Sequence, residues 1–132
     1  MPRKILIVED HVDSREILKM QIHTLGYEVI EAVSGEEALE KALVEVPDLI
    51  IMDLGLPGMN GIEAAAKLKQ QQKTTSMPVL AYTAWREEEI KEEAEKAGIA
   101  AYLTKPAELR RFRELIQKLL KTQPTNPVLA DA

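Results

Sequence analysis

The sequence predicts an α/β protein with a doubly wound, five-stranded parallel sheet whose two faces are both covered by helices. The sequence contains five short runs that resemble strands, and the first of them, KILIV at 4–8, shows no polar alternation, which is typical of a strand buried on both faces. Each run is followed by apolar residues at helical spacing, and this alternation favours parallel strands joined by right-handed crossovers. A length of 132 residues fits one domain with a substantial core.

The expected strands span residues 4–8, 27–33, 48–53, 77–83 and 100–104. A D-x-x-E capping box at 13–16 predicts the start of the first helix, and Gly26 is a suitable stop for it. A second capping box at 34–37 predicts the start of the next helix, which Pro47 ends. The apolar face of this second helix is predicted to consist of Ala38, Leu39, Ala42, Leu43 and Val46.

Three further helices are predicted over 62–72, over 86–98 with Gly98 as its stop, and from residue 107 onward. The helix at 86–98 carries glutamates four residues before lysines, which favours a solvated face over a docking surface. We therefore assign residues 1–121 to one domain. Residues 122–132 contain two prolines and no helical period, so we expect a flexible tail and no output domain.

Composition excludes several classes of function. Residues 1–66 hold 5 Lys and Arg against 13 Asp and Glu, whereas residues 67–132 hold 12 against 9, and the formal net charge is −5. An acidic chain is poorly suited to nonspecific contacts with nucleic-acid phosphates. No apolar run could span a bilayer, and no leader is evident. The absence of cysteine excludes disulfides and thiolate chemistry. We expect a cytoplasmic protein with no nucleic-acid or membrane partner.

Polar residues of the kinds that take part in catalysis and ligand binding follow four of the five expected strands. Glu9 and Asp10 follow the first strand, Asp53 ends the third, Thr83 ends the fourth, and Lys105 follows the fifth. The carboxyl ends of parallel strands lie at one edge of the sheet, where open α/β proteins bind ligands. We therefore expect these groups to meet there. The second strand ends without such a group, as an edge strand would.

Metal-assisted phosphoryl transfer to a carboxylate suits this set of groups. Clustered carboxylates repel one another unless a cation or a proton neutralises them, and Mg²⁺ prefers oxygen ligands. Aspartate can form an aspartyl phosphate, while a lysine and a hydroxyl can stabilise the transferred group. Taken singly, each residue is better explained as a capping acid, a strand-end threonine or a solvated lysine. Their expected meeting at one edge favours the functional interpretation.

Four segments resemble the receiver domain of two-component response regulators, in particular the stand-alone chemotaxis type. They are ILIVED (5–10), MDLGLPGMNGIE (52–63), YTA (82–84) and YLTKP (102–106). The resemblance covers residues 4 to about 121 and implies a flavodoxin-like fold with strand order 2-1-3-4-5. It implies no enzyme in the ordinary sense, only a domain that catalyses its own phosphorylation and dephosphorylation.

The resemblance also implies roles for the residues at the sheet edge. Asp53 would be the phosphoacceptor, with a histidine kinase or a histidine phosphotransfer protein as donor. Asp10, Asp53 and the backbone carbonyl of Gly55 would bind Mg²⁺, for which Mn²⁺ could substitute, and Glu9 would act through metal-bound water. Thr83 and Lys105 would contact the phosphoryl group.

A switch and an output surface follow from the same resemblance. Phosphorylation would draw Thr83 inward and let Tyr102 turn toward the core. The surface formed by residues 86–98, 100–104 and the last helix would then change its contacts with a downstream protein. The peptide bond between Lys105 and Pro106 is expected to be cis. The protein would be a monomer or a weak dimer.

Four positions depart from the commonest family pattern. Glu9 replaces an aspartate, and Asn60 replaces another aspartate in a loop where we expect a structural role. Gly55 and Trp85 lie two residues after Asp53 and Thr83, and the side chains at these positions flank the water that attacks the phosphoryl group. Whether Trp85 shields that water or forms a partner surface is left open, and so is the phosphoryl lifetime.

Two other functions are compatible with parts of the sequence, and two histidines lie in its first quarter. A receiver-like interaction module without phosphorylation is one alternative, and a metal-dependent phosphatase or nucleotide-binding α/β enzyme is another. The loop EDHVDS lacks the glycines of a nucleotide-binding fingerprint, and dehalogenase-type phosphatases need an aspartate where Gly55 stands. We expect His11 to be a neighbour of the site rather than a phosphodonor or a ligand, and His23 to lie on the polar side of the first helix.

Overall fold

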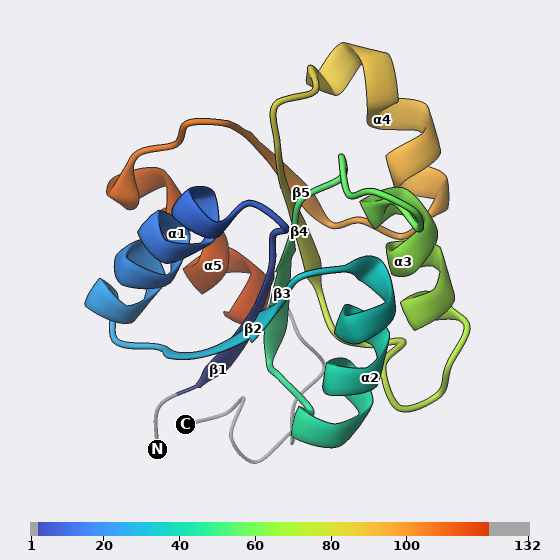
Figure 1. Ribbon diagram of the computed structural model, residues 1–132, viewed down its shortest axis with the longest axis horizontal. Helices are drawn as coiled ribbons and strands as arrows, with labels where there is room; N and C mark the ends of the chain where they lie inside the picture. Colours follow the sequence, from blue (N-terminus) through green and yellow to red (C-terminus); the bar gives the residue numbers. More distant parts are fainter. Residues whose placement is uncertain (1–2, 122–132) are drawn as a thin grey trace.

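The structure is a computed structural model that describes residues 3–121, and it confirms the alternation of strands and helices (Figure 1). The strands are β1 (Lys4–Val8), β2 (Glu28–Ala32), β3 (Leu49–Met52), β4 (Val79–Thr83) and β5 (Ala101–Thr104). The helices are α1 (Val12–Thr24), α2 (Gly35–Glu45), α3 (Gly61–Lys69), α4 (Glu87–Lys96) and α5 (Leu109–Lys121). Within residues 3–121 no helix has the length and apolar character needed to span a membrane. The proposed tail at 122–132 lies outside the described residues.

The five strands form one parallel sheet in the order β2-β1-β3-β4-β5, as the family resemblance implies. Helices α1 and α5 cover one face of the sheet, and α2, α3 and α4 cover the other (Figure 1). The chain passes from β1 outward to β2 and then returns to place β3 on the other side of β1. The strand order therefore reverses between β1 and β3, and ligands of open α/β sheets bind at such a point.

Burial on both faces explains why β1 lacks polar alternation. On β1, Leu6 and Val8 face the α2–α4 side, whereas Ile5 and Ile7 face the α1–α5 side. All four are buried, so both faces of the strand remove apolar surface from water. Phe112 of α5 is also fully buried and belongs to the core on the α1–α5 side of the sheet.

The predicted capping box at 13–16 is wrong. Helix α1 begins at Val12 with His11 as its N-cap, so Asp13 already lies in the first turn. The helix starts early because the chain leaves β1 at Val8 and the carbonyl of His11 accepts the N–H of Arg15 at 2.9 Å. The side chain of His11 makes no capping hydrogen bond.

The second predicted cap is correct in part, and a third cap is present. The hydroxyl of Ser34 accepts the N–H of Glu37 at 3.1 Å, but the Glu37 carboxylate accepts the N–H of Val33 rather than that of Ser34. Asn60 and Glu63 form a reciprocal capping box at the start of α3. Asn60 thus has the structural role expected of it.

Helices α1 and α4 end at the predicted glycines, whereas α3 ends earlier than expected. Gly26 and Gly98 have positive φ angles of 97° and 84° just after α1 and α4. Helix α3 ends at Lys69 rather than residue 72, because Thr74 is buried in the following turns and its hydroxyl donates to the Leu68 carbonyl at 2.6 Å.

The apolar face predicted for α2 is only partly buried. Ala38 and Ala42 are fully buried, whereas Leu43 and Val46 are exposed. Val46 follows the last turn of the helix in a left-handed conformation with φ of 48° and ψ of 63°, which turns it away from the helical face. A β-branched residue is strained in this conformation.

We predict that Val46→Gly stabilises the protein. The left-handed conformation costs an L-residue about 1–2 kcal/mol, and the greater freedom of glycine in the unfolded chain offsets only part of this gain. The Val46 side chain is 58% exposed, so little buried surface is lost. Urea denaturation should show an increase of about 1 kcal/mol in the free energy of unfolding.

Val44→Gly is the matched control, because Val44 is 78% exposed but lies within the helix. Glycine there should lower the free energy of unfolding by about 0.5 kcal/mol. Destabilisation by both substitutions would contradict the interpretation of strain at Val46.

Candidate functional site

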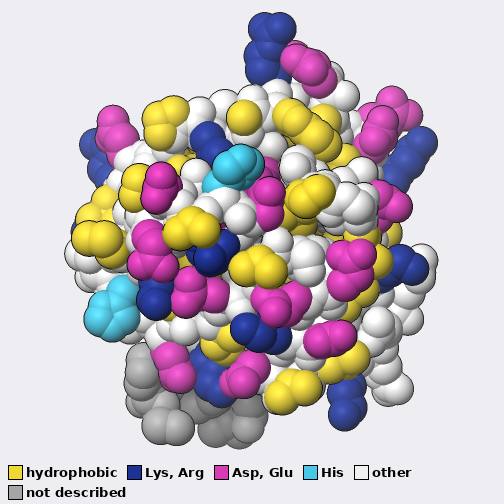
Figure 2. All heavy atoms as spheres, viewed as in Figure 1, with side chains coloured by type: hydrophobic (Ala, Val, Ile, Leu, Met, Phe, Trp, Pro, Cys, Tyr) yellow, Lys and Arg dark blue, Asp and Glu magenta, His cyan; other side chains and the backbone are white. Residues whose placement is uncertain are grey.

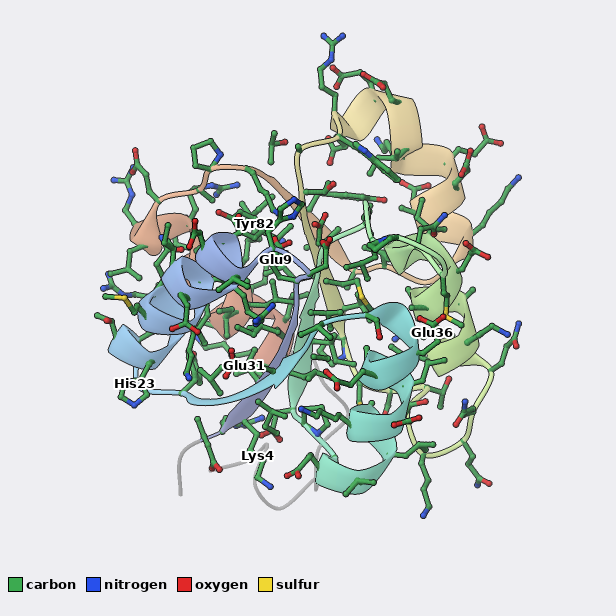
Figure 3. The ribbon with its side chains drawn as sticks, in the orientation of Figure 1. Lys4, Glu9, His23, Glu31, Glu36 and Tyr82 are labelled. Atoms are coloured by element: carbon green, nitrogen blue, oxygen red, sulfur yellow. The ribbon has the colours of Figure 1, made fainter. Side chains whose placement is uncertain are left out.

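The sequence-predicted residues meet at one edge of the sheet. Figure 3 shows Glu9 and Tyr82 near this edge and Lys4, at the start of β1, near the opposite one. The parallel register aligns Val8 with Met52 and Met52 with Ala81, so the strand ends that carry the polar groups are level. A hollow of about 300 Å³ opens there, lined by His11, Ser14, Asp53, Gly55, Thr83, Ala84, Trp85 and Lys105.

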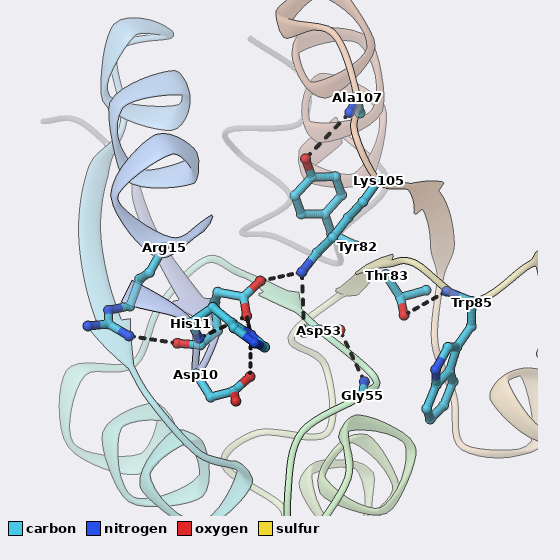
Figure 4. A network of polar contacts seen from close by, with 11 residues as sticks. Asp10, His11, Arg15, Asp53, Gly55, Tyr82, Thr83, Trp85, Lys105 and Ala107 are labelled. Carbon is cyan, nitrogen blue, oxygen red and sulfur yellow. Dashed lines mark hydrogen bonds and ion pairs between the residues drawn. The ribbon is translucent and has the colours of Figure 1, made fainter. Parts of the chain in front are cut away.

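The Lys105 ammonium joins the acids of two strands. It donates to Glu9 Oε1 and lies 3.3 Å from Asp53 Oδ2 (Figure 4). Burial alone would lower the pKa of Lys105, but the hydrogen bond to Glu9 and the charge of Asp53 raise the pKa above its ordinary value. Lys105 is therefore a cation at neutral pH, and it partly neutralises two buried acids.

Glu9 is held in place although it is almost completely buried. Its side chain is 1% exposed, and besides Lys105 it accepts the backbone N–H of His11 through Oε2 at 3.2 Å. Arg15 of α1 donates to the Glu9 backbone carbonyl at 2.9 Å. Sequence reasoning did not identify Arg15, because an arginine on a polar helix face carries no signal of the backbone group that it reaches.

Asp53 follows β3 and is 8% exposed. Its backbone N–H donates to the Val8 carbonyl at 3.0 Å, and its Oδ1 accepts the Gly55 N–H at 3.0 Å. The carboxylate is thereby oriented with its other oxygen toward Lys105. One face of the group remains open to the hollow, where a small reactant could reach it.

Gly61 allows α3 to approach the backbone around Asp53. A Cβ at this position would lie 2.4 Å from the Asp53 carbonyl oxygen and 2.7 Å from the Leu54 Cα, distances that only a backbone shift could relieve. The Gly61 N–H also donates to the Leu54 carbonyl at 3.0 Å. Sequence reasoning missed Gly61, although a glycine directly after the Asn60 cap is a signal of such a close approach.

Thr83 and Trp85 form another wall of the hollow. The Thr83 side chain is buried, and its hydroxyl accepts the backbone N–H of Trp85 at 3.2 Å. The Trp85 ring lies beside Gly55, since a Cβ on Gly55 would be 3.7 Å from it. That distance is an ordinary van der Waals contact, so Gly55 is not required by space. The ring therefore borders the open side of Asp53 (Figure 4).

The acids fit a divalent cation. Asp10 Oδ1 is inaccessible to solvent and accepts no hydrogen bond, although His11 Nδ1 lies 3.4 Å away. A buried carboxylate oxygen without a donor is costly unless a cation binds it. Donor atoms of Glu9, Asp10 and His11 all lie within 4.8 Å of one another. Oxygen-rich sites of this kind suit Mg²⁺.

Tyr102 lies outside this cluster. It pairs with Ala81 across the sheet, is half-buried, and donates its hydroxyl to the Lys91 carbonyl of α4 at 3.4 Å. Burial, followed by the nearby charges of Glu95 and Glu87, raises the pKa of Tyr102. The peptide bond between Lys105 and Pro106 is cis, as expected.

Comparison with known proteins agrees with this geometry. The family model of the response regulator receiver domain matches residues 5–117. The polar-differentiation response regulator DivK of Brucella anthropi is 37% identical over 120 residues, which cover 91% of this chain and 98% of DivK. The chemotaxis protein CheY4 of Vibrio cholerae superposes with a TM-score of 0.85 at 30% identity, covering 90% of this chain and 99% of CheY4.

A further solved structure is relevant to the divalent cation that these acids fit. The receiver domain of the sensor histidine kinase PA1611 from Pseudomonas aeruginosa superposes with a TM-score of 0.86 at 27% identity. The match covers 92% of this chain and 100% of that domain, which has a magnesium ion coordinated in its active-site cleft. The fold of this chain is thus the CheY-like, flavodoxin-like fold.

We predict that Lys105→Met destabilises the protein strongly. It leaves Glu9 buried without a cation, and removal of one partner from a buried ion pair costs about 3–5 kcal/mol. Urea denaturation at neutral pH should show a loss of this size, and Glu9→Gln added to Lys105→Met should restore part of it.

Lys19→Met is the control, because Lys19 pairs with Glu31 at 3.1 Å on the surface. Its removal should leave the free energy of unfolding almost unchanged, because solvent screens an exposed ion pair. Equal losses for the two lysine variants would show that the Lys105 contact has no special role in stability.

Proposed function

The chain belongs to the family of response regulator receiver domains, the signalling domains of two-component systems, and from this premise we propose that it accepts a phosphoryl group on Asp53. The placement of Asp53 carries the proposal: it directly follows the central strand, borders an open hollow and has a lysine cation beside it. The donor is a histidine kinase or a histidine phosphotransfer protein. The proposed output is a change in contacts with a downstream protein.

In the proposed reaction a carboxylate oxygen of Asp53 attacks the phosphorus of a phosphohistidine. The bond between phosphorus and the imidazole nitrogen breaks, the histidine takes a proton from water, and an acyl phosphate forms. Lys105 balances the charge of the transferred group, and the Thr83 hydroxyl donates to one of its oxygens. Attack of water on phosphorus later breaks the bond to Asp53 and releases inorganic phosphate.

The proposed cation ligands are Asp10, Asp53 and the backbone carbonyl of Gly55, with Glu9 acting through metal-bound water. The unpartnered Asp10 Oδ1 and the magnesium ion in the PA1611 receiver domain support this assignment. A bound Mg²⁺, or Mn²⁺ in its place, would neutralise the charge that gathers on the phosphoryl oxygens. The side chains of the site would position the phosphoryl group next to Asp53, and Lys105 would approach it from the loop after β5.

The proposed switch begins at Thr83. Its hydroxyl, which accepts the Trp85 N–H, would move toward the phosphoryl group to donate to it, and this movement would shift the backbone after β4. Tyr102 lies on the neighbouring strand, and its hydrogen bond to Lys91 ties the ring to α4. A hollow of about 510 Å³ between α4 and α5 adjoins Tyr102, so inward rotation of the ring would reshape the α4–β5–α5 face.

Helix α1 of this chain has exposed apolar side chains that a phosphodonor protein could contact. Val12, Ile17 and Met20 of this helix are large apolar side chains that are exposed to solvent. Val12 directly follows His11, which lines the hollow around Asp53. We propose that the phosphodonor covers these side chains while its histidine reaches Asp53.

We predict that acetyl phosphate and Mg²⁺ add one phosphoryl group to the parent protein, measured as intact mass. Asp53→Asn should abolish the adduct, because the amide is no nucleophile, and a chelator should suppress it. Asp13→Asn is the control, since Asp13 is an exposed acid in the first turn of α1, and it should be phosphorylated normally. Absence of an adduct on the parent would favour the unphosphorylated interaction module, and turnover of a phosphoester would favour a phosphatase.

We further predict that Trp85→Ala shortens the lifetime of the phosphoryl group. The ring borders the open side of Asp53 and limits the approach of water. Its removal should accelerate hydrolysis at least about threefold, which corresponds to ~0.6 kcal/mol of the barrier. The measurement is the decay of the phosphorylated mass after removal of acetyl phosphate.

Arg86→Ala is the control for Trp85→Ala, because Arg86 is the next residue and is exposed to solvent. Its side chain pairs only with Glu89 among the described residues, so its removal should leave the decay unchanged. An unchanged or slower decay for Trp85→Ala would refute the shielding role.

A further inference from the structure

The His11 side chain has an unusual position for the N-cap of a helix. It is 75% exposed and makes no capping hydrogen bond with α1. Its ring is instead turned toward the two preceding acids, with Nδ1 3.4 Å from Asp10 Oδ1 and 3.6 Å from Glu9 Oε2 (Figure 4). Nδ1 thus lies near the carboxylate oxygen that accepts no hydrogen bond.

The two distances from His11 Nδ1 to the carboxylate oxygens match the spacing of ligands around one ion. Donor atoms bound at ~2.1 Å lie about 3 Å apart when cis in an octahedron and about 3.4 Å apart in a tetrahedron. The distances of 3.4 and 3.6 Å from His11 Nδ1 are close to these values. Asp10 Oδ1 has no competing donor, and Glu9 Oε2 accepts only a backbone N–H.

We propose that His11 Nδ1 is an additional ligand of the cation site and gives this site a preference for first-row transition-metal ions over Mg²⁺. The inference rests on the proposed cation site at Asp10 and adds a nitrogen ligand to it. Imidazole suits nickel, zinc and iron, whereas Mg²⁺ favours oxygen ligands and its own water. The sequence favours a neighbour without function at this position, but the exposed ring lies with Nδ1 close to both acids.

A simple ion pair is the competing explanation. A protonated His11 could be attracted to Glu9 and Asp10 at these distances without any metal. The two explanations differ in what they predict for metal binding. A nitrogen ligand adds affinity for Ni²⁺ and little for Mg²⁺, whereas a cationic imidazole opposes both ions equally.

The test compares Ni²⁺ and Mg²⁺ affinities of the parent protein and of His11→Asn. Binding can be followed by isothermal titration calorimetry and by the fluorescence of the single tryptophan, which borders the same hollow. His11→Asn should weaken Ni²⁺ binding by about tenfold or more, the scale on which even indirect partners of metal ligands act. Mg²⁺ affinity should change by less than about twofold, because the ligands of Mg²⁺ are oxygens.

The second histidine provides a matched control. His23 lies in the last turn of α1, and Figure 2 shows the two histidine side chains well separated on this face. His23→Asn should leave both affinities unchanged. Asp10→Asn should weaken both ions, since it removes the shared ligand. Asparagine is favourable at an N-cap, so His11→Asn should keep the parent's circular dichroism and melting temperature.

Several results would overturn the inference. They are an unchanged Ni²⁺ affinity in His11→Asn, an equal change for Ni²⁺ and Mg²⁺, or an equal loss of Ni²⁺ affinity in His23→Asn. Phosphorylation of Asp53 is measured separately by mass, so the two proposals can fail independently. Selective loss of Ni²⁺ affinity in His11→Asn supports the nitrogen ligand even if Asp53 accepts no phosphoryl group.

Discussion

The contact of Lys105 with Glu9 and Asp53 is the interaction on which the site depends. Glu9 and Asp53 come from neighbouring strands and are almost inaccessible to solvent, so their charges repel strongly without a cation between them. Lys105 supplies that cation from the loop after β5, a segment that follows Asp53 by 52 residues. A single ammonium thereby joins β1, β3 and β5. It also leaves charge uncompensated at Asp10, where a divalent cation can bind.

The order of the strands explains why these groups meet at all. Parallel register brings the ends of β1, β3 and β4 level, and the reversal of order between β1 and β3 leaves room above them. Small residues then allow close approach, as Gly61 does where α3 begins beside the Asp53 backbone. Asp53 follows a buried strand, and backbone hydrogen bonds hold it in place in addition to the side chains of its neighbours.

The site at this edge of the sheet also lies close to α4 and β5. Thr83 is both a wall of the hollow and a hydrogen-bond partner of the Trp85 backbone, and Tyr102 on the next strand is bonded to α4. In the proposed switch a charge added at Asp53 would attract the Thr83 hydroxyl, and the pairing of β4 with β5 would transmit this movement to Tyr102. Trp85 and His11 flank the opposite sides of this arrangement. Both side chains line the hollow, one as an apolar wall and the other with the imidazole nitrogen proposed as a metal ligand.

The sequence by itself determined the alternation of strands and helices, the layers and the residues at the sheet edge, because apolar period and strand-end polar groups are local features. The strand order came only from family resemblance. Tertiary structure alone decided the start of α1 at Val12, the exposure of Leu43 and Val46, and the reach of Arg15 to the Glu9 backbone. It alone also placed His11 Nδ1 near Asp10. These features depend on where distant segments pack and which backbone groups they leave unpaired, and no local pattern contains that information.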